Sequence, residues 1–166
     1  MPSALVPLAN LTLGSAAATV TFSSISSSYR DLYLVCSFGF SVTGVSPVMQ
    51  LNADTGANYS FVIAQGNGSS ASSPSGSAQN FMWLNYNGSY ATTPVSTMIC
   101  NIMDYSATDK HKTTLVRAGD TATNGAVEMS AHRWASTAAV TSIKIYPYSS
   151  GNFVAGSTFA LYGVSA

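Results

Sequence analysis

Apolar and polar side chains alternate with a period of two along much of this chain, and this pattern constrains the fold more than any other feature. Within residues 31–42 every second side chain from Leu32 to Phe40 is apolar. Successive side chains of a β-strand point to opposite faces, so the alternation predicts a strand with one buried face. Further strands are predicted at 19–22, 48–52, 59–65, 81–86, 94–103, 113–117, 126–133, 140–148 and 158–164. No segment has the spacing and end caps of an amphipathic helix.

Short turn signals separate these strands. Asn-Gly occurs at 67–68, 87–88 and 124–125, Thr-Gly at 43–44 and 55–56, and Ser-Gly at 150–151. Such pairs favour the tight turns of antiparallel sheets. About ten short strands joined in this way predict an all-β fold, an antiparallel β-sandwich with the jelly roll as the favoured form. A closed barrel or an immunoglobulin-like sandwich is the alternative.

The length of 166 residues predicts a single β-sandwich domain over 1–166. Residues 1–13 contain two prolines and several apolar side chains, which predict an extended N-terminal arm. Its candidate partner contacts are Leu5, Val6, Leu8 and Leu11, and an ordinary edge strand is the alternative. Residues 66–78, GNGSSASSPSGSA, lack apolar anchors and are predicted to form a mobile exposed loop.

Charge is scarce in this sequence. Charged residues make up 7%, and six Lys and Arg balance six Asp and Glu, against about 25% charged residues in typical soluble domains. So few cations argue against nucleic-acid binding, which needs a positive patch. No apolar stretch reaches the ~18 residues of a membrane span, and no signal peptide is visible, which predicts synthesis in a cytoplasm. A net charge of zero favours association, and the apolar residues on both sides of the 94–103 strand indicate a central strand or an interface.

The motif Asp54-Thr55-Gly56 matches the active-site signature of aspartic proteases. That chemistry needs two carboxylates that share a proton, and no second copy of the motif occurs. The alternative is a turn in which Asp54 accepts backbone hydrogen bonds. We therefore expect no enzyme and no catalytic residues.

No cofactor or metal is expected either. His111 and His132 have no partners at zinc-ligand spacing, and no glycine-rich turn opens a helix as in nucleotide sites. Cys36 and Cys100 lie in apolar strands and are interpreted as buried structural thiols, with one disulfide as the alternative.

Aromatic side chains could stack on a carbohydrate. Nine Tyr, seven Phe and two Trp are present. The candidate ligand-stacking residues are Trp83, Tyr86, Tyr90 and Trp134. Aromatic residues of a sandwich also form cores and interfaces, which is the alternative for this set.

Several segments together resemble a known family. They are LTLGSAAATVTFSSI and YRDLYLV within 11–35, LNADTGANYS at 51–60, GNGSS at 66–70 and RWASTAAVTSIKIYPYSSGNFVAGSTFALYGV at 133–164. This combination resembles small virion proteins of tailed bacteriophages, which stand alone or form C-terminal modules of tail fibres. The resemblance implies a β-sandwich or jelly-roll component of the virion, a homotrimer without enzymatic activity.

Two placements in the virion follow from this resemblance. The first is a capsid cement or decoration protein that binds the phage major capsid protein on the outside of the coat lattice. The second is a receptor-binding protein at the tip of a tail fibre or tailspike that recognises host surface glycans. The first is preferred, and its mechanism needs only modest contacts that add by avidity in a trimer.

Overall fold

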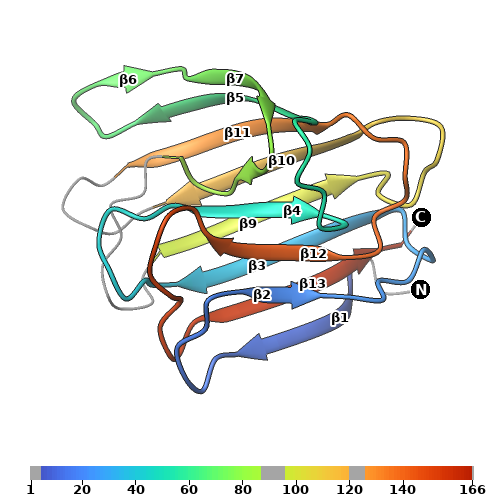
Figure 1. Ribbon diagram of the computed structural model, residues 1–166, viewed down its shortest axis with the longest axis horizontal. Helices are drawn as coiled ribbons and strands as arrows, with labels where there is room; N and C mark the ends of the chain where they lie inside the picture. The colour runs from blue at the N-terminus through green and yellow to red at the C-terminus, as the bar shows by residue number, and fades with distance from the viewer. Residues whose placement is uncertain (1–4, 87–95, 120–125, 166) are drawn as a thin grey trace.

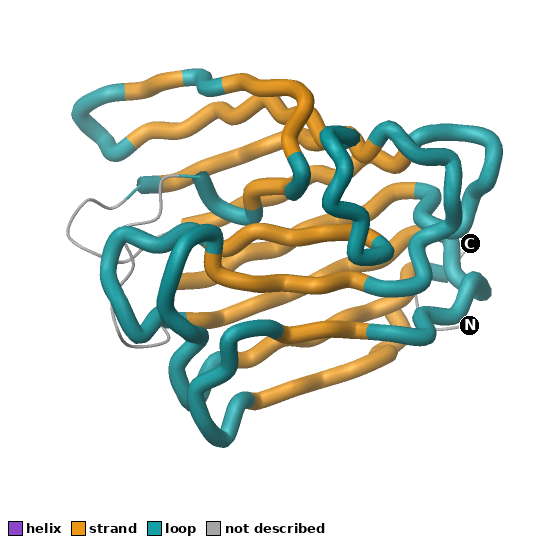
Figure 2. The backbone as a smooth tube through the Cα atoms, in the orientation of Figure 1, coloured by secondary structure: helices purple, strands orange, loops and turns teal. Residues whose placement is uncertain are grey.

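The computed structural model describes residues 5–86, 96–119 and 126–165 (Figure 1). All paired strands in these ranges run antiparallel and form two layered sheets, and no helix occurs there (Figure 2). The prediction of an all-β antiparallel sandwich is confirmed. The predicted turns at 87–88 and 124–125 lie outside the described residues.

One sheet has nine strands and the other has four. The larger sheet runs in the order β1 (Leu5–Thr12), β13 (Thr158–Val164), β3 (Asp31–Phe38), β9 (Ser96–Met103), β10 (Lys112–Gly119), β11 (Val127–Trp134) and β5 (Tyr59–Gly66). At its far edge β6 (Ala71–Ser72) and β7 (Ser75–Gln79) both pair with β5. The smaller sheet runs in the order β2 (Val20–Phe22), β12 (Ile143–Pro147), β4 (Pro47–Leu51) and β8 (Met82–Trp83).

The connectivity is that of a jelly roll with two insertions. Eight framework strands follow one another along the chain as β1, β2, β3, β4, β8, β9, β12 and β13. The first, eighth, third and sixth of them adjoin in one sheet, and the second, seventh, fourth and fifth adjoin in the other. This is the strand order of two interlocked Greek keys, so the jelly roll is confirmed and the other two architectures do not fit. The inserted strands β5–β7 and β10–β11 widen the larger sheet alone.

The main core lies between the two sheets. On β3 the side chains alternate between buried and half-buried, and Leu32, Leu34 and Phe38 point inward. Burying each such side chain contributes about 1.5–3 kcal/mol relative to leaving it exposed. Phe153 lies fully buried among three other rings, with centroid separations of 5.1 Å to Phe40 and 5.0 Å to Phe159. The period-two pattern thus reports which side chains fill the sandwich.

A second core cluster lies beneath the inserted strands. It comprises Val48, Phe61, Ile63, Phe81 and Trp83, with Tyr146 packed against it. The inner face of β10 and β11 also buries polar side chains beside this cluster, namely Thr114, Glu128, Ser130 and His132. The inserted part of the sheet therefore has a mixed interior.

The N-terminal segment is an edge strand, which corrects the prediction of an extended arm for residues 5–12. β1 pairs with β13 from Leu5 opposite Val164 to Thr12 opposite Thr158. Leu8 packs against the main core, whereas Leu5 and Leu11 remain exposed. Backbone pairing with β13 and the anchoring of Leu8 hold the segment on the sandwich. Residues 1–4 of the predicted arm lie outside the described residues.

The predicted loop at 66–78 is also corrected. β6 and most of β7 fall within it, although their side chains are mainly exposed. Pairing with β5 orders these residues through the backbone, which explains why the side-chain pattern gave no strand signal. Gly76 is required there, because a Cβ atom at this position would lie 2.7 Å from the ring of Phe61.

Both cysteines are buried and free, in agreement with the structural-thiol interpretation. Burial raises the pKa of Cys100 to about 12 and that of Cys36 well above its ordinary value, so both thiols stay protonated at neutral pH. Over the described ranges no helix is long and apolar enough to cross a membrane.

Candidate functional site

The polarity of β11 is inverted relative to that of a normal surface strand. Its buried side chains include Glu128, Ser130 and His132, whereas Val127 and Met129 are 65% and 53% exposed. A strand with one solvated face normally places its apolar side chains inward and its polar ones outward. On β11 the exposed apolar residues therefore lie on the outer face, which points away from the four-stranded sheet.

The neighbouring strands add further exposed apolar side chains, although β5 and β9 also bury apolar residues on their inner faces. Val62 on β5, Leu115 on β10 and Met103 on β9 are also exposed on the outer face. Val62 pairs with Ala131, and Ala131 pairs with Leu115, so these side chains adjoin across three strands. We call this surface the apolar face and define it by the outward side chains of β5, β9, β10 and β11. Contiguous apolar patches of this kind mark interaction surfaces.

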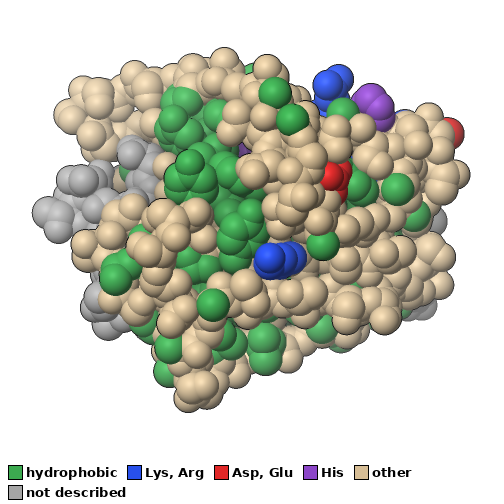
Figure 3. Space-filling view, viewed as in Figure 1, with side chains coloured by type: hydrophobic (Ala, Val, Ile, Leu, Met, Phe, Trp, Pro, Cys, Tyr) green, Lys and Arg blue, Asp and Glu red, His purple; other side chains and the backbone are tan. Residues whose placement is uncertain are grey.

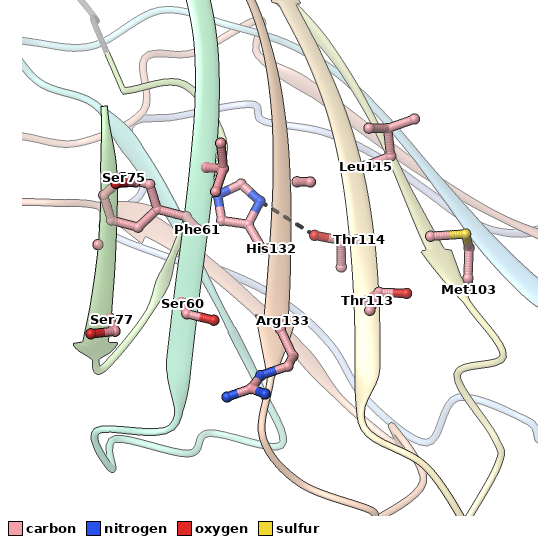
Figure 4. Close-up of a pocket in the computed structure, with 13 residues that line it drawn as sticks. Ser60, Phe61, Ser75, Ser77, Met103, Thr113, Thr114, Leu115, His132 and Arg133 are labelled. Atoms are coloured by element: carbon pink, nitrogen blue, oxygen red, sulfur yellow. Dashed lines mark hydrogen bonds between the residues drawn. The ribbon is translucent and has the colours of Figure 1, made fainter. Parts of the chain in front are cut away.

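The apolar face is hollowed rather than flat. A cavity of about 650 Å³ lies over Val62, Ala131 and Leu115, and Figure 4 shows Ser60, Thr113 and Arg133 at its border. Further cavities of about 520 Å³ and 370 Å³ lie beside Met129 and Ile99. The surface can thus receive protruding side chains of another molecule.

Trp134 is not a ligand-stacking residue. It is 2% exposed and its ring stacks on Tyr59 at a centroid distance of 6.4 Å. Its indole Nε1 donates a hydrogen bond of 2.6 Å to Oδ2 of Asp54. The prediction was wrong because the strand end around 134 turns its inward face into the core.

The other predicted aromatics form a cluster, with one exception. Trp83 is 8% exposed and lies among the rings of Phe81, Tyr86 and Tyr148, at centroid distances of 4.9, 5.1 and 4.7 Å. Only Tyr86 and Tyr148 offer substantial exposed ring surface. Figure 3 shows hydrophobic side chains gathered in this region, between β4 and β5. Tyr90 lies outside the described residues.

The Asp-Thr-Gly motif forms a structural turn. Oδ1 of Asp54 accepts a hydrogen bond from the backbone N–H of Gly56 at 2.8 Å. Oδ2 accepts hydrogen bonds from Trp134 Nε1 and from Asn58 Nδ2, the latter at 2.9 Å. Burial opposes ionisation, but the hydrogen bonds from Trp134, Asn58 and Gly56 outweigh it and lower the pKa of Asp54. The carboxylate is thus used to fix the turn.

Replacing Asp54 with Asn is expected to lower the free energy of unfolding at pH 7 by about 1–2 kcal/mol, because a charged acceptor becomes a neutral one. The lowered pKa means that the carboxylate stabilises the fold above its unfolded-state pKa and that this contribution is lost as the pH falls through the folded-state pKa. Urea unfolding at several pH values measures both effects. The control is Asp109→Asn in an exposed loop, and equal losses in the two variants would contradict the structural role.

The histidines do not assemble a catalytic group in the described structure. His111 is exposed in a charged loop, whereas His132 is buried with Nδ1 3.4 Å from Oγ1 of Thr114. Lys112 is buried and its ammonium donates hydrogen bonds to the carbonyls of Lys110 and Thr137, which holds two loops together. Among the residues described, no three His, Cys, Asp or Glu side chains gather as a metal site would require.

The predicted partner contacts lie along one edge of the larger sheet. Leu5 is exposed on the same outer side as Val164, and Leu11 is exposed opposite Phe159. Val6 and Leu8 are partly buried. Whether this edge contacts a partner stays a prediction.

From the sequence, the residues of the apolar face, apart from the 94–103 strand, were not predicted to form an interaction surface. The available signal was the alternation of apolar and polar residues in 127–132, which does not indicate which of the two sets faces inward. Periodicity is identical for a normal and an inverted strand. The inversion becomes visible only when the covering layer is known.

The sequence matches no protein-family model and no curated protein. Among solved structures, the chain is similar to the galectin LEC-6 of Caenorhabditis elegans, with 10% identity over 95% of this chain and 96% of that one, at a TM-score of 0.37. It is also similar to a protein of unknown function from Shewanella oneidensis (10% identity, 98% and 76% of the two chains, TM-score 0.20). A third similarity is to the VP2 subviral particle of infectious bursal disease virus (10% identity, 96% and 41%, TM-score 0.15). Likenesses this weak carry no argument about function.

Proposed function

We propose that this protein is a structural component of a tailed-bacteriophage virion, a cement or decoration protein that binds the outer coat lattice through the apolar face. The observation that carries the proposal is the inverted polarity of β11. An isolated protein gains nothing by exposing Val127 and Met129 while it buries Ser130 and His132. A partner that covers the face stabilises the complex by about 25 cal/mol for each Å² of apolar surface removed from water.

Two further features support this reading. The resemblance of the sequence to small phage virion proteins covers most of the chain. The chain is rich in uncharged hydroxyl side chains, with 27 Ser and 16 Thr, and has no net charge, so electrostatic repulsion between crowded copies is weak. In a trimer each contact can be weak, because the contacts add through their high effective concentration.

The first test is the copy number of the protein in purified virions, measured by quantitative mass spectrometry against the major capsid protein. We expect a simple fraction of the capsid copy number, such as one third, one half or one. A few copies per hundred capsid subunits would instead indicate a tail or vertex position and favour the receptor-binding alternative. Absence from the particle would overturn both placements.

The receptor-binding alternative is favoured by one specific observation. Tyr86 and Tyr148 expose ring surface around Trp83, and aromatic faces of this kind stack on sugars. If it is correct, a glycan array should give hits with the wild-type protein that Tyr148→Ala abolishes. Val62→Ala on the opposite side of the sheet is the control and should leave those hits unchanged.

A further inference from the structure

Two arginines are the charged side chains on the apolar face. Arg133 lies beside Ser60 and Thr113, and Arg117 lies beside Met129 and Ile99. Both are exposed, and neither forms an ion pair with another described residue. Exposed cations are usually solvated, but these two border cavities with largely apolar linings.

The carboxylates of the described chain are directed elsewhere. Asp31 forms an ion pair with Arg30 and accepts a hydrogen bond from the backbone N–H of Asp104. Glu128 points to the inner face, and Asp54 fixes its turn. On the outer face of β5, β9, β10 and β11 the charged side chains are therefore both positive, among apolar and uncharged polar residues.

The two charges have a defined spacing. Arg117 lies four residues along β10 from Thr113, which pairs with Arg133. At about 3.3 Å per residue the two positions are about 13 Å apart along the strands. Leu115, Ala131 and Val62 fill the interval between them. The surface thus presents an apolar centre with a cation toward each end.

A second copy of the chain is a poor match for this surface. In a two-fold contact the same patch meets itself, so a face with positive charge only would meet positive charge. The exposed carboxylate of Asp109 and the half-exposed one of Asp104 belong to a loop that also carries Lys110 and His111. No other surface among the described residues therefore combines apolar side chains with flanking carboxylates that could pair with Arg117 and Arg133.

We infer that the apolar face binds a different protein, whose contact surface is apolar and carries two carboxylates about 13 Å apart that pair with Arg117 and Arg133. This inference rests on the proposed function, in which that protein is the major capsid protein. Each arginine can take a carboxylate through two parallel hydrogen bonds, which adds geometric selection to the apolar contact.

The experiment measures binding of purified variants to capsids that lack this protein. We expect Arg117→Glu and Arg133→Glu each to weaken binding about tenfold or more, because each places like charges at the contact. Lys144→Glu makes the same charge change on the four-stranded sheet and should bind within about twofold of wild type. Raising the salt concentration from about 50 mM to about 500 mM should weaken wild-type binding more than that of an Arg117→Gln, Arg133→Gln double variant.

The outcomes separate this inference from the proposed function. If wild type binds, Met129→Glu fails to bind and the arginine variants bind as wild type does, the acidic partner surface is wrong and the docking face stands. If the wild-type protein does not bind capsids, both proposals fail. If the isolated protein dimerises and Arg133→Glu prevents it, the occupant is a second copy and the inference is overturned. Thermal unfolding of each variant verifies that these exposed substitutions leave the fold intact.

Discussion

Lowering the pH from about 7 to about 4.5 is expected to reduce the free energy of unfolding of the isolated protein through one buried side chain, His132. Its burial lowers its pKa to about 4, whereas an exposed histidine in the unfolded chain has a pKa of about 6.5. The unfolded chain therefore binds a proton in this range that the folded protein does not. The neutral imidazole contributes its full share to the free energy of unfolding above about pH 6.5, and this contribution is lost as the pH falls toward 4.

The expected size is large for one residue. Each pH unit within the window costs up to about 1.4 kcal/mol, and the whole window corresponds to about 3 kcal/mol. Urea unfolding at half-unit pH steps measures the slope. Carboxylates titrate mainly below this range, so the interval between about pH 6.5 and 5 reports chiefly on histidine.

The chain supplies a matched control for this experiment. His132→Gln should flatten the slope between about pH 6.5 and 5 even if it shifts the stability at neutral pH. His111→Gln, at an exposed loop position, should leave the slope as it is in wild type. A slope that persists in His132→Gln would show that another group takes up the proton.

Replacing Phe153 with Ala is expected to give the largest loss of stability of any substitution considered, about 3–5 kcal/mol. The ring is fully buried and contacts the rings of Phe38, Phe40 and Phe159. Its removal leaves a cavity that the surrounding strands cannot close, because the backbone of Phe153 is held by two hydrogen bonds to Ala17, of 2.9 and 3.0 Å.

The measurement for Phe153→Ala is the free energy of unfolding in urea at pH 7, with Val62→Ala as the control. Val62 is 58% exposed, so its truncation should change stability by no more than about 0.5 kcal/mol in the isolated protein. A loss below about 1.5 kcal/mol for Phe153→Ala would mean that the core closes over the missing ring. In that case the aromatic group at the junction of the two sheets would be less rigid than the structure indicates.

Much of the framework could be predicted because its strands bury one face. The strand at 31–38 follows the alternation from Leu32 to Phe38, and the strand at 158–164 does so from Phe159 to Leu161. β6 and β7 were missed, and β1 was predicted only as the alternative to an extended arm, because edge strands are ordered by backbone pairing, which leaves little trace in side-chain polarity. The sequence also does not say which distant strand supplies that pairing.

The candidate site was harder to predict, for a different reason. Large aromatic residues can serve either as ligand-stacking surfaces or as core residues, and burial decides between the two. Trp134 is buried in the core of the sandwich. The apolar face could not be predicted from the sequence, because Val127, Met129 and Ala131 alternate with polar residues just as in a strand with normal polarity. Which of the two sets faces water depends on the layer that covers β11, and that layer comes from residues far away in the sequence.

Both margins of the larger sheet are built so that it does not add further strands. On one side Pro7 offers no backbone N–H, and the register of β1 shifts between Pro7 and Ala9. On the other side the margin is divided between two short strands, β6 and β7, which leave no long straight edge. Edge-to-edge pairing of two copies through this sheet is therefore disfavoured, so a contact between copies would have to be made by side chains.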